Sequence, residues 1–295
     1  MANLKEIRTR ITSVNSTMQI TSAMKMVSAA KLKRAQDSIT QMRPYAQKLQ
    51  QMLGNLTETM LEMENPYATE RPVNKVLVIA ITSNRGLCGG FNANIIKQVA
   101  RLSATELAGK EVTLYPIGKK AADAFKRDAR LYSGEALMNH TEACTIFDDM
   151  NYQKAVDIFQ PVMDAYAAGS FDEVLVIYNQ FKNAATQLVT TESLLPVKAD
   201  ENAVASLENN DYIFQPGKEE LLEVLIPTAL KTAFYKGLKD SLASEHGARM
   251  TAMHKATDNA SDLLGDLKLT YNKARQAAIT TEILEIVGGA EALNG

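Results

Sequence analysis

The chain of 295 residues contains no tryptophan and only two cysteines, Cys88 and Cys144. The two cysteines form neither a CxxC pair nor a disulfide framework, which indicates a reducing compartment. Aromatic residues make up only 6 % of the chain, whereas methionine occurs 13 times. This balance favours helix-rich packing over a β-sandwich.

Long hydrophobic runs are also absent. No stretch of about 18 apolar residues occurs anywhere, so we expect that the chain does not span a membrane. The first residues, MANLKEIRTRI, carry charges where a signal peptide needs an apolar core. Any link to a membrane is therefore expected to come through partners.

Charge is distributed unevenly, although the formal net charge is only −2. The segment 1–48 has two acidic residues, Glu6 and Asp37, against nine basic ones: Lys5, Arg8, Arg10, Lys25, Lys31, Lys33, Arg34, Arg43 and Lys48. Such a segment indicates an acidic partner. Nucleic acid and a merely solvated helix face remain alternatives, and we favour an acidic protein surface.

The first 43 residues contain neither glycine nor proline, and apolar residues recur there at alternating steps of three and four. This spacing predicts a long helix with a coiled-coil seam that continues to Met60. Thr21, Lys25 and Ser28 interrupt the seam, and nearby apolar residues move to another face: Ile20, Met24 and Val27. The interruption is either a local stutter or a surface for a second partner. Pro44 is expected to bend or loosen the helix.

A second long helix is predicted from Leu221 to about Val287. Its seam includes Met253, Ala256, Ala260, Leu263, Leu267, Tyr271, Ala274 and Ala278. Gly237, Gly247 and Gly265 weaken this prediction locally without ending the helix.

The middle of the chain alternates between the two kinds of element. Segments 75–81, 111–118 and 172–181 are rich in β-branched residues and predict strands, and 185–195 is expected to form a hairpin with the third of them. Helices are predicted between them at 92–107, 119–128 and 152–168. This alternation predicts a mostly parallel, Rossmann-like α/β sheet.

Length then sets the expected architecture. A helix of about 55 residues is roughly 80 Å long, whereas a unit of about 140 residues is only about 35–40 Å across. The terminal helices are therefore expected to project beyond the central domain and, since both are tethered at their inner ends, to pair as an antiparallel coiled coil. We assign 1–65 to the first helix, 73–197 to the α/β domain, 198–217 to an exposed loop and 218–295 to the second helix.

The turn TSNRGLCGGFN (82–92) follows the first strand, where many proteins bind phosphate. It lacks the lysine of a P-loop, and its glycines do not have GxGxxG spacing. We interpret it as a tight strand-to-helix crossover, with Cys88 as a packed thiol. Neither a metal-binding set around His246 and His254 nor a nucleophile with its base stands out. We therefore expect no catalytic, cofactor-binding or metal-binding residues.

The end of the second helix places apolar residues on more faces than one partner helix can cover. Ile279, Ile283, Leu284 and Val287 are the main ones, interspersed with Thr280, Glu282 and Glu285. On a projecting tip this pattern predicts an enclosing apolar partner surface.

The pattern I-T-x-E-x-x-E-x-x-x-G-A-x-A from Ile279 to Ala292 resembles the signature of the gamma subunit of F-type ATP synthases. Other segments resemble the same family in the same order: QITSAMKMVSAAKL (19–32), RPYA (43–46), SNRGLCGGFN (83–92), ARMTAMHKATDNA (248–260) and LTYNKARQAAIT (269–280). The resemblance covers almost the whole chain. Asn84 and Ser28 are modest departures from the family pattern.

The resemblance implies the central rotor shaft of a proton-transporting ATP synthase, without catalytic groups of its own. The shaft would turn with the membrane c-ring, drive ATP synthesis or hydrolysis at the beta subunits, and regulate ATPase activity and proton flow. Implied partners are three alpha and three beta subunits, the epsilon subunit and the c-ring, with no nucleic acid. The implied location is peripheral, on the cytoplasmic face of the bacterial inner membrane.

Site residues follow from the same resemblance. Met24 and Lys25 match the place where the shaft meets an acidic loop of a beta subunit, and Arg249 is a further beta contact. Arg275, Gln276 and Thr280 match a polar patch that binds a catch loop on beta. Ile279, Ile283, Leu284 and Val287 match the part that turns in an apolar sleeve. A nucleotide-dependent enzyme built on the sheet and a coiled-coil adaptor on nucleic acid remain the two rival interpretations.

Overall fold

The structure is a computed structural model that describes residues 4–55, 65–69, 71–132, 140–197 and 217–294. Contacts divide the chain into two compact units, which are described separately. The larger unit runs from Ala29 to Arg249, and the smaller unit combines Met1–Ser28 with Met250–Gly295. Apart from Gly217, the predicted loop 198–217 lies outside the described residues.

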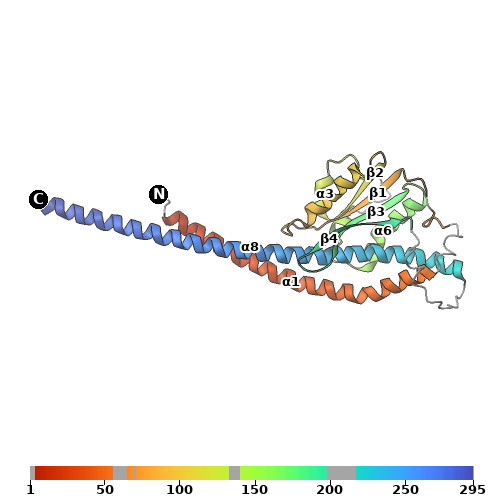
Figure 1. The fold of residues 1–295 in the computed structure, drawn as a ribbon, viewed down its shortest axis with the longest axis horizontal. Coiled ribbons are helices and arrows are strands. Elements are labelled where there is room, and N and C mark those ends of the chain that lie inside the picture. The colour runs from red at the N-terminus through yellow and green to blue at the C-terminus, as the bar shows by residue number, and fades with distance from the viewer. Residues whose placement is uncertain (1–3, 56–64, 70, 133–139, 198–216, 295) are drawn as a thin grey trace. The chain divides into compact units, whose positions relative to one another are not determined.

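Two long helices and a four-stranded sheet make up most of the fold (Figure 1). The elements in chain order are α1 (Leu4–Asn55), β1 (Lys75–Ile81), α3 (Phe91–Ala104), β2 (Glu111–Ile117), α4 (Lys119–Phe125), α5 (His140–Thr145), α6 (Tyr152–Ala167), β3 (Glu173–Phe181), β4 (Gln187–Leu195) and α8 (Lys218–Asn294). The predicted fold class, a coiled coil of the terminal helices with a central α/β domain, is confirmed. Pro44 lies inside α1, which is assigned as one helix on both sides of it.

The sheet has the strand order β2-β1-β3-β4. β1 pairs in parallel with β2 and β3, whereas β3 and β4 pair antiparallel, so the predicted hairpin is confirmed. Six of the seven residues of β1 are buried. A parallel strand covered on both faces needs such a continuous apolar run, and KVLVIAI supplies it.

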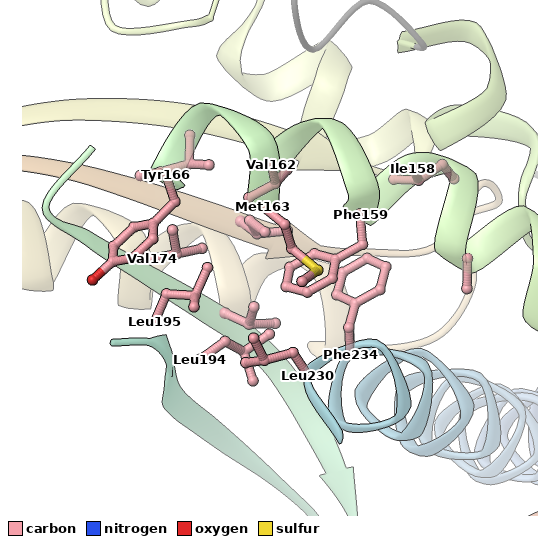
Figure 2. Packing of buried hydrophobic residues seen from close by; sticks show 14 of the residues in the cluster. Ile158, Phe159, Val162, Met163, Tyr166, Val174, Leu194, Leu195, Leu230 and Phe234 are labelled. Carbon is pink, nitrogen blue, oxygen red and sulfur yellow. The ribbon is translucent and has the colours of Figure 1, made fainter. Parts of the chain in front are cut away.

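Each face of the sheet has its own apolar core. α3 and α4 pack on one face, where Ile95, Val99 and Phe125 meet Val76 and Val78. α5, α6 and the part of α8 around Phe234 pack on the other, together with Leu49 of α1. Figure 2 shows Phe159 of α6 against Phe234 of α8, and the two rings stack with their centroids 4.6 Å apart. Such a stacked pair adds about 0.5–1.5 kcal/mol beyond the area that it buries.

Glycines in α8 allow it to approach the sheet domain closely. A Cβ at Gly237 would lie 3.7 Å from the ring of Tyr178, and one at Gly247 would lie 3.1 Å from the carbonyl oxygen of Ala184 in the β3–β4 turn. At Gly265, by contrast, an added Cβ would meet nothing within 4 Å. Two of the three glycines that weaken the helix pattern are therefore explained by packing.

Candidate functional site

In the smaller unit the two terminal helix segments pair antiparallel. The hydroxyl of Thr257 donates to the hydroxyl of Thr21 over 2.9 Å, and Lys25 Nζ lies 3.3 Å from His254 Nδ1. The residue numbers of these pairs sum to 278 and 279. In this register Leu4 lies level with Ala274 or Arg275, so the end of α8 extends past the first described residue of α1.

Burial shows which residues form the seam of this pair. Ile7, Thr21 and Ser28 of α1 are buried, so the seam continues through two of the polar residues that interrupt the apolar pattern. In the α8 segment of this unit, Met253 and Leu264 are buried. The prediction of Leu263 was wrong, because steps of four and three from Met253 lead through Thr257 and Ala260 to Leu264, which leaves Leu263 on the exposed side.

Around the polar interruption, α1 exposes apolar side chains on its outer side. Ile20, Met26 and Val27 are exposed, whereas Met24 is half-buried. Lys25 contacts His254, whose ring in turn lies 3.3 Å from the carboxylate of Asp258. The Lys25 ammonium therefore already has a partner on α8. Its predicted contact with a beta subunit stays a prediction.

The predicted partner contacts near the end of α8 lie on its solvent-exposed surface. Arg275, Gln276 and Thr280 are exposed, and the Thr280 hydroxyl donates to the carbonyl of Gln276. The apolar residues from Ile279 onward are also exposed, to between 48 % and 71 %: Ile279, Ile283, Leu284, Ile286 and Val287. This run is the exposed apolar tip. It lies beyond the α1 segment that pairs with α8 in residues 4–28.

In the larger unit the glycine-rich turn after β1 is held from inside by short polar contacts. The amide of Asn92 donates to the Ser83 hydroxyl over 2.8 Å and to Cys88 Sγ over 3.2 Å, and its oxygen accepts the backbone N–H of Ser83. Cys88 is buried, as predicted for a packed thiol. Leu87 has φ 63° and Gly89 has φ 59°, so the backbone at Leu87 adopts a conformation that L residues rarely take.

Arg249 of α8 contacts this turn. Its Nη2 donates to the carbonyl oxygens of Arg85 and Gly86 over 3.1 and 3.2 Å, and its Nη1 donates to Glu245 Oε1 over 2.5 Å. Arg249 as a whole residue is 8 % exposed. The predicted contact of Arg249 with a beta subunit is untested, and the described structure directs its guanidinium into its own chain.

Burial shifts the pKa values of the groups next to Arg249. Burial raises the pKa of the Glu245 carboxyl, and the nearby charges of Arg249, Lys31 and Arg85 only partly oppose this. Burial, followed by the charges of Arg249 and Lys31, lowers the pKa of His246 to about 4. At neutral pH the cluster therefore contains a neutral imidazole. The spacing of Glu245 four residues before Arg249 could have indicated their pairing, but not their burial.

Among the described residues, no group of three or more His, Cys, Asp or Glu side chains is arranged to hold a metal ion. In the same part of the chain, no helix is both long and apolar enough to cross a lipid bilayer.

Terminal helix segments that pair antiparallel in one unit and an α/β domain in the other define a class of fold, and comparisons with known proteins agree on its family. The family model described as ATP synthase matches residues 3–293. The ATP synthase gamma chain of Flavobacterium johnsoniae is 58 % identical and that of Geotalea daltonii 44 %, each over 100 % of both chains.

Solved structures show the same architecture. A chain from the central stalk and c-ring structure of the Tetrahymena thermophila mitochondrial ATP synthase is 28 % identical with a TM-score of 0.57, covering 80 % of this chain and 99 % of that one. A Euglena gracilis mitochondrial ATP synthase chain has a TM-score of 0.64 at 21 % identity, covering 98 % and 94 %, and supports the fold. The chain belongs to the ATP synthase gamma chain family, which confirms the resemblance drawn from its motifs.

Proposed function

We propose that this chain is the central rotor shaft of an F-type ATP synthase and couples rotation of a membrane ring to ATP synthesis or hydrolysis on neighbouring subunits. The observation that carries the proposal is the full-length similarity to ATP synthase gamma chains, at 58 % identity to the Flavobacterium johnsoniae protein. The related Tetrahymena chain comes from a structure of the central stalk and c-ring.

The exposed apolar tip supports this role. Its side chains expose a contiguous apolar surface to water, and such surfaces usually mark a site where a partner binds. In the proposed complex Ile279, Ile283, Leu284 and Val287 turn inside an apolar sleeve, which constrains position without fixing an angle. Arg275, Gln276 and Thr280, where the tip begins, supply hydrogen bonds to a beta subunit.

Weak polar contacts suit a shaft that must occupy several angles. An exposed ion pair contributes about 0–1 kcal/mol, so a pair between Lys25 and an acidic beta loop, with Met24 beside it, would not hold the rotor at one angle. A deeply buried pair costs about 3–5 kcal/mol to break and would hold it there. Torque then depends on the asymmetry and stiffness of the helix pair more than on any one bond.

The proposed partners are three alpha and three beta subunits, an epsilon subunit and the c-ring. The chain would contact the membrane sector through these partners, on the cytoplasmic face of a bacterial inner membrane. Catalytic residues would belong to the neighbouring subunits, and the chain itself would contribute the moving surface.

Reconstitution tests the proposal. Purified chain is mixed with alpha and beta subunits, and a bead on the larger unit reports ATP-driven rotation. Copurification with both subunits, restored ATPase turnover and stepwise rotation are expected. ATP binding by the isolated chain, or salt-sensitive retention on DNA without assembly, would instead favour one of the two rival interpretations.

A further inference from the structure

The contact between Arg249 and the glycine-rich turn joins two segments that are far apart in sequence. The guanidinium reaches the carbonyl oxygens of Arg85 and Gly86, more than 160 positions earlier in the chain. Its Nε adds a longer contact of 3.4 Å to the Gly86 oxygen. A planar guanidinium can hold two adjacent acceptors in a fixed geometry, which a lysine ammonium cannot do.

Glu245 fixes the direction of that guanidinium. The Glu245 and Arg249 side chains are 9 % and 10 % exposed and lie one helical turn apart on α8. A buried cation needs a paired anion, and hydrogen bonds between ionised groups are roughly twice as strong as neutral ones. The carboxylate accepts from Nη1, whereas Nη2 and Nε donate to the turn.

The turn has a reason to need this support. Leu87 directly follows the two carbonyls that Arg249 binds, and it combines a left-handed φ of 63° with 63 % exposure. A non-glycine residue in this region costs about 1–2 kcal/mol and persists where surrounding contacts hold it. Inside the turn, Asn92 holds Ser83, and the Ser83 hydroxyl donates to the Arg85 carbonyl over 2.7 Å, so that carbonyl has a partner besides Arg249. Among the described side-chain hydrogen bonds, those that reach the Gly86 carbonyl come from Arg249.

We propose that Arg249 is a positioning residue: the buried Glu245–Arg249 pair latches the turn 84–89 onto α8 and holds Leu87 in its exposed, left-handed conformation. The turn and this part of α8 then move as one body. This consequence rests on the rotor function proposed above: when α8 rotates, the turn rotates with it and does not move relative to α8.

Cys88 provides a built-in probe of the latch, because its thiol is only 2 % exposed at the end of the turn. With Cys144 replaced by serine, the rate of maleimide labelling of the full-length chain reports opening of the turn. Arg249→Ala is expected to raise this rate at least about tenfold, which corresponds to about 1.4 kcal/mol. Arg249→Lys is expected to give a smaller rise, because its ammonium makes single bonds.

The matched control is Arg130→Ala. Arg130 makes a bidentate pair with Asp128 over 2.9 and 2.7 Å in the same unit, away from the turn. The latch would be overturned if the Cys88 labelling rate in Arg249→Ala lay within about twofold of the rate in Arg130→Ala. Loss of one good hydrogen bond should change the rate about tenfold. Hydrogen exchange of β1 amides is measured alongside. Equal loss of protection in β1 and the turn would also overturn it, because Arg249 would then stabilise the whole domain.

Labelling requires no other subunit, so its outcome is independent of assembly with alpha and beta. An unchanged labelling rate in a chain that still drives rotation would remove the latch and leave the rotor function standing. A raised Cys88 labelling rate in Arg249→Ala, together with a parent chain that never assembles with alpha and beta, would support the latch and remove the rotor function. In the assembled complex, the latch predicts that Arg249→Lys lowers ATP-driven proton pumping more than ATP hydrolysis.

Discussion

Thr257 of α8 donates its hydroxyl to that of Thr21 on α1 over 2.9 Å, inside the seam of the helix pair. Both hydroxyls also lie within hydrogen-bonding distance of a carbonyl of their own helix, Met18 for Thr21 and Met253 for Thr257. One layer above, Lys25 meets His254. The interruption of the apolar pattern is therefore a polar layer shared by the two helices, and each hydroxyl retains a local partner.

The Thr21–Thr257 contact is expected to contribute little to stability. Because each hydroxyl can bond its own backbone, Thr21→Val and Thr257→Val should each change the free energy of unfolding by less than about 1 kcal/mol. The double variant should be neutral or more stable, since two apolar side chains of the same shape then meet. A double-mutant cycle from thermal unfolding of the helix pair gives the coupling energy, and a value above about 2 kcal/mol would contradict this account.

Gly118 is expected to be the least replaceable glycine of the sheet domain. It has φ +93°, and a Cβ there would lie 2.1 Å from the carbonyl oxygen of Thr82. Gly118→Ala should therefore destabilise by about 3 kcal/mol or more, from backbone strain and from displacement of β1. Gly109→Ala is the control, because Gly109 has φ +84° with nothing within 4 Å of a Cβ. Urea unfolding should show about 1–2 kcal/mol for the control.

Gly265→Ala should stabilise α8. No atom lies within 4 Å of the added Cβ, and alanine is favoured over glycine in a helix interior by about 1 kcal/mol. Slower amide exchange around residue 265 would show the gain. Gly247→Ala is the comparison, since its Cβ would press on the Ala184 backbone at 3.1 Å. A gain at Gly247 as large as that at Gly265 would mean that the β3–β4 turn yields freely.

His246 is expected to make the larger unit less stable in acid. Its pKa of about 4 lies below the ordinary histidine value of 6.5, so the unfolded chain binds the proton more tightly. The contribution is complete above about pH 6.5 and is lost as the pH falls to about 4, by about 3 kcal/mol in total. Arg249 and Lys31 are the charges that oppose protonation.

Unfolding by urea at pH 7 and pH 5 tests this, with His246→Gln as the variant that removes the titrating group. The raised pKa of Glu245 acts in the opposite direction, because the folded chain then takes up that proton more readily as the pH falls. Because His246→Gln has no imidazole to protonate at this position, the variant should lose less stability than the parent between these two pH values. An equal loss in both proteins would rule out His246 as the source.

Strong local patterns predicted most of the fold, and tertiary contacts account for the errors. Strands such as KVLVIAI were readable because both faces are buried, and β3 and β4 paired as expected. α5, by contrast, is a six-residue helix, HTEACT, too short to show a helical period. The choice of Leu263 over Leu264 failed because both are apolar and only the register with α1 distinguishes them.

The buried polar cluster on α8 was the least predictable feature. Ser241, Ser244, Glu245, His246 and Arg249 are all buried, although such residues usually lie on a solvated helix face. In sequence, Glu245 and Arg249 match an ordinary exposed ion pair. Contacts with segments distant in sequence accompany their burial: the turn at 85–86 meets Arg249, and Lys31 of α1 lies near Glu245. The predicted Arg249 site was noticed through family resemblance, whereas its partners came from the structure.

The exposed apolar tip should matter for function and not for folding. Leu284 is 65 % exposed, so Leu284→Asp removes almost no buried area from the chain and its melting temperature should change by less than a few degrees. In the assembled complex the same change would bury a carboxylate in an apolar sleeve, which costs several kcal/mol. We expect weaker assembly or slower rotation with alpha and beta subunits. Leu264→Asp is the opposite control, because Leu264 is buried against α1 and its replacement should unfold the helix pair before any partner is added. Normal assembly and rotation of Leu284→Asp would show that no apolar sleeve encloses this residue.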